Sequence, residues 1–333
     1  MADGDSSIKV VLSAVFGNLV ITIAKFAGWI LSGSPSMLAE GIHSLADTFN
    51  QGLLFVGIKH GQVGPSRNHP FGLGQSRYLW NLVSAIGIFF VGFGVTAYHG
   101  FLSLFESEEF YVSKWQGLSI GILIFSFFIE SIPFYLAVKA VNAERGERGL
   151  LEQILTSDNP TNLGVLFEDA IALLGVIVAL VGIGMSQYFE SFIPDAIASI
   201  VIAILLGVMA VVLAFINGRL LIGRAVTVGK EQDILEFVRN FPSVERVAKV
   251  RTEIRGPKRM GLTMEVEFHG SFLIDRYQIE KDAEAIRKGE DPIPILVDTA
   301  ERMVRVVGRE INRLEEAIQK KFPEITYIEL EVN

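Results

Sequence analysis

The chain contains no cysteine and only five histidines among its 333 residues. Without thiols it can form neither a disulfide nor a thiolate metal site, so a bound metal must be held by imidazole, carboxylate or amide groups. An HExxH segment and a cysteine nucleophile are also absent. These absences argue against an intramembrane hydrolase, in which a metal would activate water, and we expect no enzyme and no organic cofactor.

Charged side chains are scarce in the first two thirds of the chain and common in the last third. Of the 29 Lys and Arg residues, 18 follow Val228. Half of all residues are hydrophobic and the mean hydropathy is +0.42, which is too apolar for an ordinary soluble domain. We therefore predict a membrane domain over residues 1–224 and a soluble domain over 225–333. The formal charge of −8 argues against a nucleic-acid partner.

Six apolar stretches are each long enough to cross a lipid bilayer, which takes about 20 residues. They cover residues 8–32, 37–60, 78–105, 114–141, 161–187 and 193–221. Basic residues gather at the second and fourth connectors and after the sixth stretch. By the positive-inside rule, six transmembrane helices and two cytoplasmic termini are predicted.

The last third reads as a small α+β domain. Helical spacing covers residues 231–240 and 298–321, and alternating apolar residues predict strands at 244–253, 262–268 and 325–332. The order αββαβ is typical of a two-layer sandwich. Residues 275–298 read as a surface insertion with a short helix at 277–287.

Ionisable residues inside the apolar stretches are the candidate functional groups. His43 and Asp47 are four residues apart, so they share one helix face, and Asp169 follows Glu168 in the fifth stretch. A charge at bilayer depth costs about 2.5–3.5 kcal/mol on insertion scales. By the predicted topology, His43, Asp47 and Asp169 all fall near the midplane. Imidazole and carboxylates there predict a divalent metal site between two antiparallel helices.

Several ordered motifs carry a resemblance to a known family. They are the segments 36–47 (SMLAEGIHSLAD), 69–72 (HPFG) and 194–199 (PDAIAS). With them the chain resembles the cation diffusion facilitator family, solute carrier family 30. Residues 77–100 and 166–169 are most similar to the zinc transporter nine branch and its bacterial relatives.

The resemblance implies a homodimer that exports divalent cations, usually Zn²⁺, from the cytoplasm in exchange for protons. It also implies six transmembrane helices and a ferredoxin-like cytoplasmic domain that serves dimerisation or regulation. The family's metal ligands correspond to His43, Asp47 and Asp169, whereas Val165 stands where a second histidine is expected. Glu168 is the obvious substitute ligand. A carboxylate-rich site is harder and favours Mn²⁺, Co²⁺ or Fe²⁺ beside Zn²⁺.

The resemblance also suggests a mechanism. Metal ligands must lose their protons to bind, so a higher proton activity on the far side drives release. His43 has the ordinary pKa nearest that range, and we assign it the exchanged proton. Access to the site would alternate as helices rock around a fixed midplane position.

Other polar residues keep two interpretations each. Glu168 is either a ligand or an acid beside the exit path. Asn50 and Asn162 either line the path by which the ion enters or hold helices together through hydrogen bonds. Glu130 is either a proton relay or a partner for backbone freed near Pro133.

Two further functions stay open: a membrane-anchored metal sensor, and a structural metal-binding protein without transport. We expect lipid, a divalent metal ion, protons and a second copy of the chain as partners. The first residues have no basic region typical of a signal or transit peptide. We therefore expect a bacterial plasma membrane, with an organelle membrane as the second choice.

Overall fold

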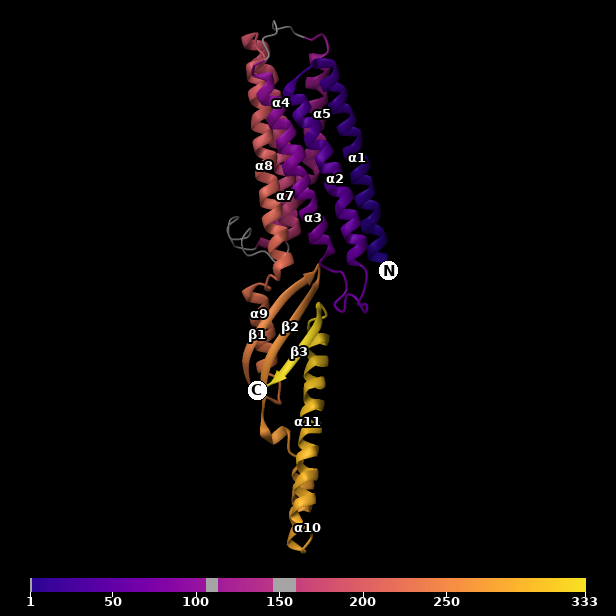
Figure 1. Cartoon of the computed structure of the whole chain (residues 1–333), viewed down its shortest axis with the longest axis vertical. Helices are drawn as coiled ribbons and strands as arrows, with labels where there is room; N and C mark the ends of the chain where they lie inside the picture. The colour runs from indigo at the N-terminus through magenta and orange to yellow at the C-terminus, as the bar shows by residue number, and fades with distance from the viewer. Residues whose placement is uncertain (1, 106–112, 146–159) are drawn as a thin grey trace. The chain divides into compact units, whose positions relative to one another are not determined.

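The computed structural model describes residues 2–105, 113–145 and 160–333, and their side chains over 15–105, 113–142 and 164–333 (Figure 1). The chain divides into two compact units, Met1–Ile222 and Gly223–Asn333. The boundary predicted at residue 224 lies two residues beyond this division.

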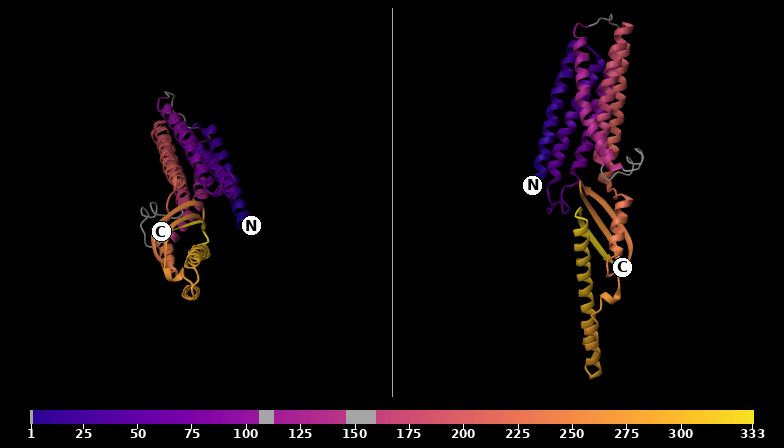
Figure 2. Two further views of the ribbon diagram at one scale, coloured as in Figure 1. Left: turned by 60° about the horizontal axis from the view of Figure 1, so that its bottom comes forward. Right: turned by 180° about the vertical axis from the view of Figure 1, so that it is seen from behind.

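The N-terminal unit is a bundle of long helices that run side by side (Figures 1 and 2). Over the described residues they are α1 (Ala2–Ser32), α2 (Pro35–Gly61), α3 (Ser76–Gly87), the π-helical η1 (Ile88–Val95), α4 (Thr96–Ser103), α5 (Gln116–Arg145), α7 (Pro160–Phe189) and α8 (Ile193–Ile222). Within the described part of the chain, five segments are long and apolar enough to cross a membrane: 15–32, 76–103, 116–142, 164–189 and 193–222. Helix α2 is also long, but its polar residues make it less hydrophobic than the other five.

The turn before α2 sets where this polar helix begins. Gly33 has a φ of +72°, which favours a residue without a side chain. Ser34 caps the helix, since its side chain accepts a hydrogen bond from the Met37 N–H at 3.2 Å, and Pro35 occupies the first turn. Helix α2 then packs against α1, α3, α7 and α8, so neighbouring helices cover it on several sides.

The C-terminal unit contains a three-stranded sheet with helices packed against it. Its elements are α9 (Val228–Arg239), β1 (Val244–Gly256), β2 (Arg259–Phe268), the short 3₁₀ helix η2 (Gly270–Phe272), α10 (Arg276–Arg287), α11 (Pro292–Lys321) and β3 (Ile325–Val332). The strand order is β1-β2-β3, with β1 antiparallel and β3 parallel to β2. Ile234 and Val238 of α9 and Leu314 and Ile318 of α11 fill the core against the sheet.

The alternation predicted for the middle strand is confirmed, because Leu262, Met264, Val266 and Phe268 are all buried. The predicted start of the long helix at residue 298 is wrong. Helix α11 begins six residues earlier, where Asp291 accepts a hydrogen bond from the Ile293 N–H at 3.1 Å and Pro292 enters the first turn. Much of the predicted insertion is therefore helical, as α10 and the first turns of α11.

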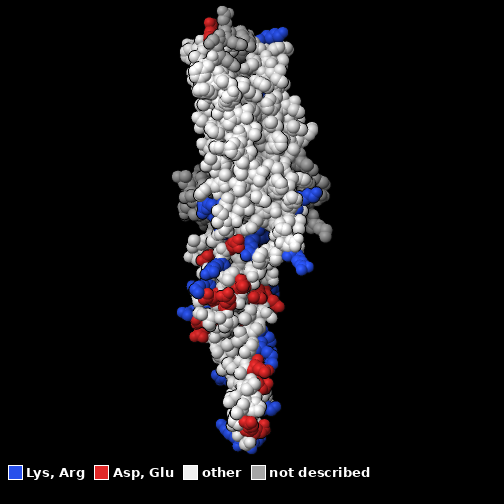
Figure 3. All heavy atoms as spheres, viewed as in Figure 1, with Lys and Arg blue, Asp and Glu red and all other residues white. Residues whose placement is uncertain are grey.

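The two units differ in how many charged residues they carry at the surface, as the sequence predicts. In the face drawn in Figure 3, Lys, Arg, Asp and Glu gather over the C-terminal unit, whereas the N-terminal unit shows almost none along its length. Its surface carries large apolar side chains instead, among them Phe90, Phe125 and Phe128, each more than 60% exposed. Such a surface is suited to lipid rather than water.

Candidate metal site

The polar face of α2 brings His43 and Asp47 together. Their side chains approach to 3.1 Å between His43 Nε2 and Asp47 Oδ2, and the imidazole is 1% exposed. This distance is that of an ion pair, and the other imidazole nitrogen, Nδ1, is buried without a hydrogen-bond partner. Two ligands of one tetrahedral ion lie about 3.3 Å apart when each bond is about 2.0–2.1 Å. The spacing therefore fits two donors that point at a shared cation.

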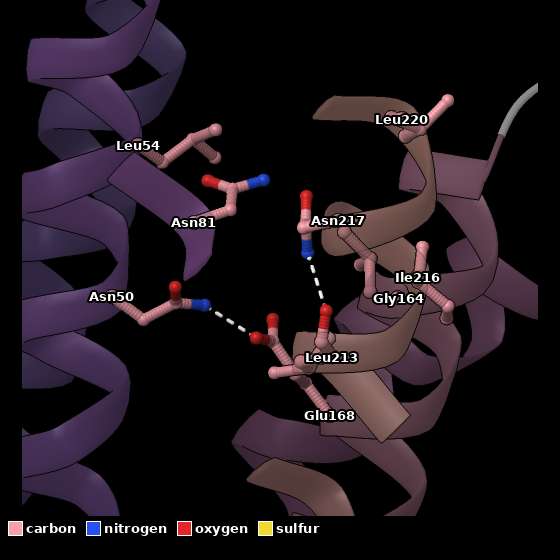
Figure 4. Close-up of a pocket in the computed structure, with 10 residues that line it drawn as sticks. Asn50, Leu54, Asn81, Gly164, Glu168, Leu213, Ile216, Asn217 and Leu220 are labelled. Carbon is pink, nitrogen blue, oxygen red and sulfur yellow. Dashed lines mark hydrogen bonds between the residues drawn. The ribbon is translucent and has the colours of Figure 1, made fainter. Parts of the chain in front are cut away.

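Helix α7 supplies two carboxylates with different surroundings. Asp169 keeps one buried side-chain oxygen, Oδ2, without a hydrogen-bond partner. Glu168 instead accepts a hydrogen bond from the Asn50 side-chain amide of α2 (Figure 4). Asp169 is thus available for a ligand, whereas part of the Glu168 carboxylate is already engaged.

Two contacts fix how α2 and α7 lie against each other. Asn50 meets Glu168, and the free oxygen of the Glu40 carboxylate meets Gly175, where a Cβ would have no room. The higher residue number in α2 (Asn50) meets the lower residue number in α7 (Glu168), so the two helices are antiparallel. Measured along the helix axis at about 1.5 Å per residue, Asp47 lies about 10.5 Å beyond Glu40 in α2, and Asp169 lies about 9 Å before Gly175 in α7. The two aspartates therefore lie at the same level of the bundle.

The predicted four-residue ligand set is not assembled in this conformation. Among the side chains that the structure describes, no three His, Asp or Glu groups converge to metal-binding distance. His43 pairs with Asp47, Glu168 pairs with Asn50, and Asp169 has an open oxygen. The set His43, Asp47, Asp169 and Glu168 stays a prediction.

A small polar cleft opens beside Glu168. It has a volume of about 40 Å³, enough for a water molecule, and it is lined by Asn50, Asn81, Glu168 and Asn217 together with apolar side chains of α7 and α8. Figure 4 shows the three amides and the carboxylate around one space. The Asn217 amide donates to the Leu213 carbonyl at 2.8 Å, and Asn81 Oδ1 is buried without a partner.

Of the three amides that line this cleft, Asn50 was identified from the sequence, but Asn81 and Asn217 were not. Asn50 was predicted either to line the path of the ion or to hold helices together; it borders the cleft and also hydrogen-bonds Glu168 of the neighbouring helix, so both interpretations stay open. Asn162 belongs to α7, but its side chain lies outside the described residues. Asn81 and Asn217 were not singled out, although each is an amide inside an apolar stretch, which is the signal that would have found them.

One short serine motif has a structural explanation. Residues 117–121 read G-x-S-x-G, the pattern of a hydrolase nucleophile on a strand–turn–helix corner. Here they lie inside α5, and the Ser119 hydroxyl donates to the Gly28 carbonyl of α1 at 3.1 Å. The motif therefore joins two helices and offers no nucleophile.

Comparison with known proteins finds a family model and relatives named for metal transport or metal tolerance. The model of the cation efflux transmembrane domain matches residues 11–222. The human protein named proton-coupled zinc antiporter SLC30A9, mitochondrial, is 30% identical over 333 residues, which cover 97% of this chain. The chain spans only 58% of that relative's length.

Plant and bacterial proteins are similar too. Metal tolerance protein C4 of Arabidopsis thaliana is 30% identical over 337 residues, which cover 98% of this chain and 73% of the plant protein. The manganese efflux system protein MneP of Bacillus subtilis is 21% identical over 248 residues, which cover 74% of this chain and 80% of MneP.

Proposed function

Because this chain belongs to the cation efflux family, also called the cation diffusion facilitator family, we propose that it is a divalent cation/proton antiporter that moves Zn²⁺ out of the cytoplasm. One observation carries this proposal. His43 and Asp47 lie 3.1 Å apart with the imidazole buried, and an unpartnered carboxylate oxygen of Asp169 lies at the same level of a neighbouring helix. Unsatisfied ligand atoms inside an apolar bundle are costly unless an ion uses them.

We propose the following path for the ion. It enters through the cleft of Asn50, Asn81 and Asn217, whose amide oxygens replace part of its water shell. It passes Glu168 and binds His43, Asp47 and Asp169, and Glu168 completes the shell when its bond to Asn50 opens. Protons arriving from the far side compete for the same groups and release the ion.

The topology that accompanies this path has six transmembrane helices and two cytoplasmic termini. Helix α2 would be the sixth span, although its polar residues lower its hydropathy. The segment η1 joins α3 to α4 within one span. The C-terminal unit would be a ferredoxin-like cytoplasmic domain through which two copies dimerise. We propose a bacterial plasma membrane as the location. An organelle membrane is the alternative, because the human relative is named as mitochondrial.

Transport into sealed vesicles tests the proposal. Purified protein in proteoliposomes should accumulate Zn²⁺ when a pH gradient is imposed, and Asp47→Ala or Asp169→Ala should abolish this flux. Asp233→Asn, which removes an exposed acid of α9, is the matched control and should transport normally. A variant without Asp47 that still concentrates zinc would contradict the site, and a wild-type protein without flux would favour the sensor or structural function.

The choice of metal needs a separate measurement. Val165 lies one turn before Asp169, is 38% exposed and borders the cleft. Because valine has no ligand atom, the proposed site has one imidazole and three carboxylates. The Bacillus relative is named for manganese efflux, which favours Mn²⁺ as the second candidate. Val165→His should add an imidazole and shift competition among Zn²⁺, Mn²⁺, Co²⁺ and Fe²⁺ towards zinc. An unchanged order would show that residue 165 does not face the ion.

A further inference from the structure

A second buried cluster of charges joins α1, α2 and α5. The Lys25 ammonium donates to Glu40 Oε2 at 2.7 Å and to Glu130 Oε1 at 2.9 Å. The side chains of Lys25 and Glu40 are fully buried, and that of Glu130 is 14% exposed. One cation thus stands between two carboxylates inside the apolar bundle.

This cluster is incompletely satisfied. Glu40 Oε1 and Glu130 Oε2 are both buried without a hydrogen-bond partner. Buried ion pairs contribute little stability unless every remaining polar atom is bonded, and apolar side chains of similar size often serve as well. A purely structural junction would not need two acids for one base, or two open oxygens.

The cluster lies next to the proposed ion path. Glu40 is three residues before His43, so it shares that helix face about 4.5 Å nearer the start of α2. Its open oxygen meets Gly175 of α7, six residues beyond Asp169. In the proposed orientation this is the outer side of the His43–Asp47 pair.

Glu130 lies on α5, a helix that contains a proline one turn further along. Pro133 lies inside α5, where it removes a backbone hydrogen bond and allows the helix to bend. The Glu130 carboxylate binds Lys25 rather than the backbone freed by this proline. A bend of α5 at Pro133 would therefore move Glu130 relative to Lys25 and Glu40.

We propose that Glu40 and Glu130 form a second divalent cation site on the exit side, which the Lys25 ammonium occupies whenever no metal is there. A departing ion displaces the ammonium and binds the two carboxylates through their oxygens, the ligand type suited to Mn²⁺ and acceptable to Zn²⁺. When the ion leaves, Lys25 returns and blocks backward movement. This inference rests on the proposed function for the direction of flow, but not for the binding itself.

Metal binding without transport tests the site. In an Asp47→Ala background, which disables the first site, equilibrium dialysis with Zn²⁺ or Mn²⁺ should detect no tight ion. Adding Lys25→Gln should create one tight site per protomer, and adding Glu40→Gln as well should remove it. Lys25→Arg, which retains a cation, is the matched control and should gain no site. If Lys25→Gln adds no binding to folded protein, the proposal is wrong.

A milder variant covers the case in which Lys25→Gln does not fold. Glu130→Gln leaves the Lys25–Glu40 pair in place and removes one exit ligand. Metal affinity at the first site should stay unchanged, whereas zinc flux should fall severalfold at saturating metal. Unchanged flux would overturn the exit site. Loss of flux in Asp47→Ala tests the proposed function alone, so the two can fail separately.

Discussion

The two units use charged residues in opposite ways. In the C-terminal unit, ion pairs such as Arg246–Glu267 and Lys249–Glu265 cross the sheet at the surface, where each basic side chain is 64% exposed. In the N-terminal unit, ionisable groups are few, and Lys25, Glu40 and His43 are buried. Exposed pairs are screened by water and contribute little, whereas a charge in an apolar bundle is costly to keep. A buried charge in the N-terminal unit is therefore a candidate functional group, whereas an exposed ion pair in the C-terminal unit is not.

The sharpest test of this contrast removes one acid from each unit. Asp169→Asn keeps the size of the side chain but removes its charge, and zinc flux should fall by at least about 100-fold, which is about 2.7 kcal/mol of transition-state binding. Glu267→Gln in β2 removes a partly exposed acid that pairs with Arg246 and should leave flux unchanged. Both fluxes are measured in proteoliposomes at equal protein density. Equal losses would remove the distinction between the units.

Apolar packing, rather than charge, should hold the C-terminal unit together. Leu314 is fully buried between α11 and the sheet, so Leu314→Ala should destabilise the unit by about 2–5 kcal/mol. Val304→Ala in the same helix removes a side chain that is 73% exposed and should change little. Proteolysis of the 333-residue chain in urea would compare the two variants. Similar losses would show that the exposed part of α11 is covered in solution.

Tight packing around Glu40 should make Gly175 sensitive to one methyl group. A Cβ at this position would strike the Glu40 carboxylate, which Lys25 holds in place. Gly175→Ala should therefore cost about 1–3 kcal/mol and slow transport. Gly184→Ala, in the same helix but with open space around its Cβ, is the matched control. Thermal unfolding in detergent would measure both, and equal midpoints would place Glu40 elsewhere.

The smallest expected effect concerns pH and the α10–α11 pair. Hydrogen bonds from Gln278 and Thr299, with the nearby Arg302 guanidinium, hold the pKa of Asp282 below its ordinary value of 3.8. A lowered folded-state pKa stabilises the pair above the ordinary value, and this contribution is lost as pH falls below about 4. The protection of the α10 amides against hydrogen exchange, relative to the intrinsic exchange rate at each pH, should therefore fall between pH 5 and pH 3. Asp282→Asn should remove most of that pH dependence, and an unchanged profile would assign it to other groups.

Much of this arrangement follows from residue spacing. The i, i+4 rule predicted that His43 and Asp47 share a face, and apolar run lengths predicted the long helices that the structure contains. The Asp291–Pro292 capping pair was readable but was interpreted as loop, so the start of α11 was misplaced. Caps depend on a few atoms, and proline is common both in loops and in the first turn of helices.

The remaining polar partners could not be read from spacing. Lys25 meets Glu130 across 105 positions of the chain, and Asn50 meets Glu168 across 118. Periodicity tells which face of a helix a residue occupies, but not which helix packs there. Lys25, Asn81 and Asn217 acquire their significance only when α1, α2, α3, α5, α7 and α8 are placed together.

The contact between Glu40 and Gly175 also constrains how this protein can change during evolution. The two positions share a fixed space, so a larger residue at 175 requires a shorter acid at 40. Relatives with alanine at the position of Gly175 should therefore carry aspartate at the position of Glu40. Gly175→Ala combined with Glu40→Asp should recover the stability that Gly175→Ala alone loses.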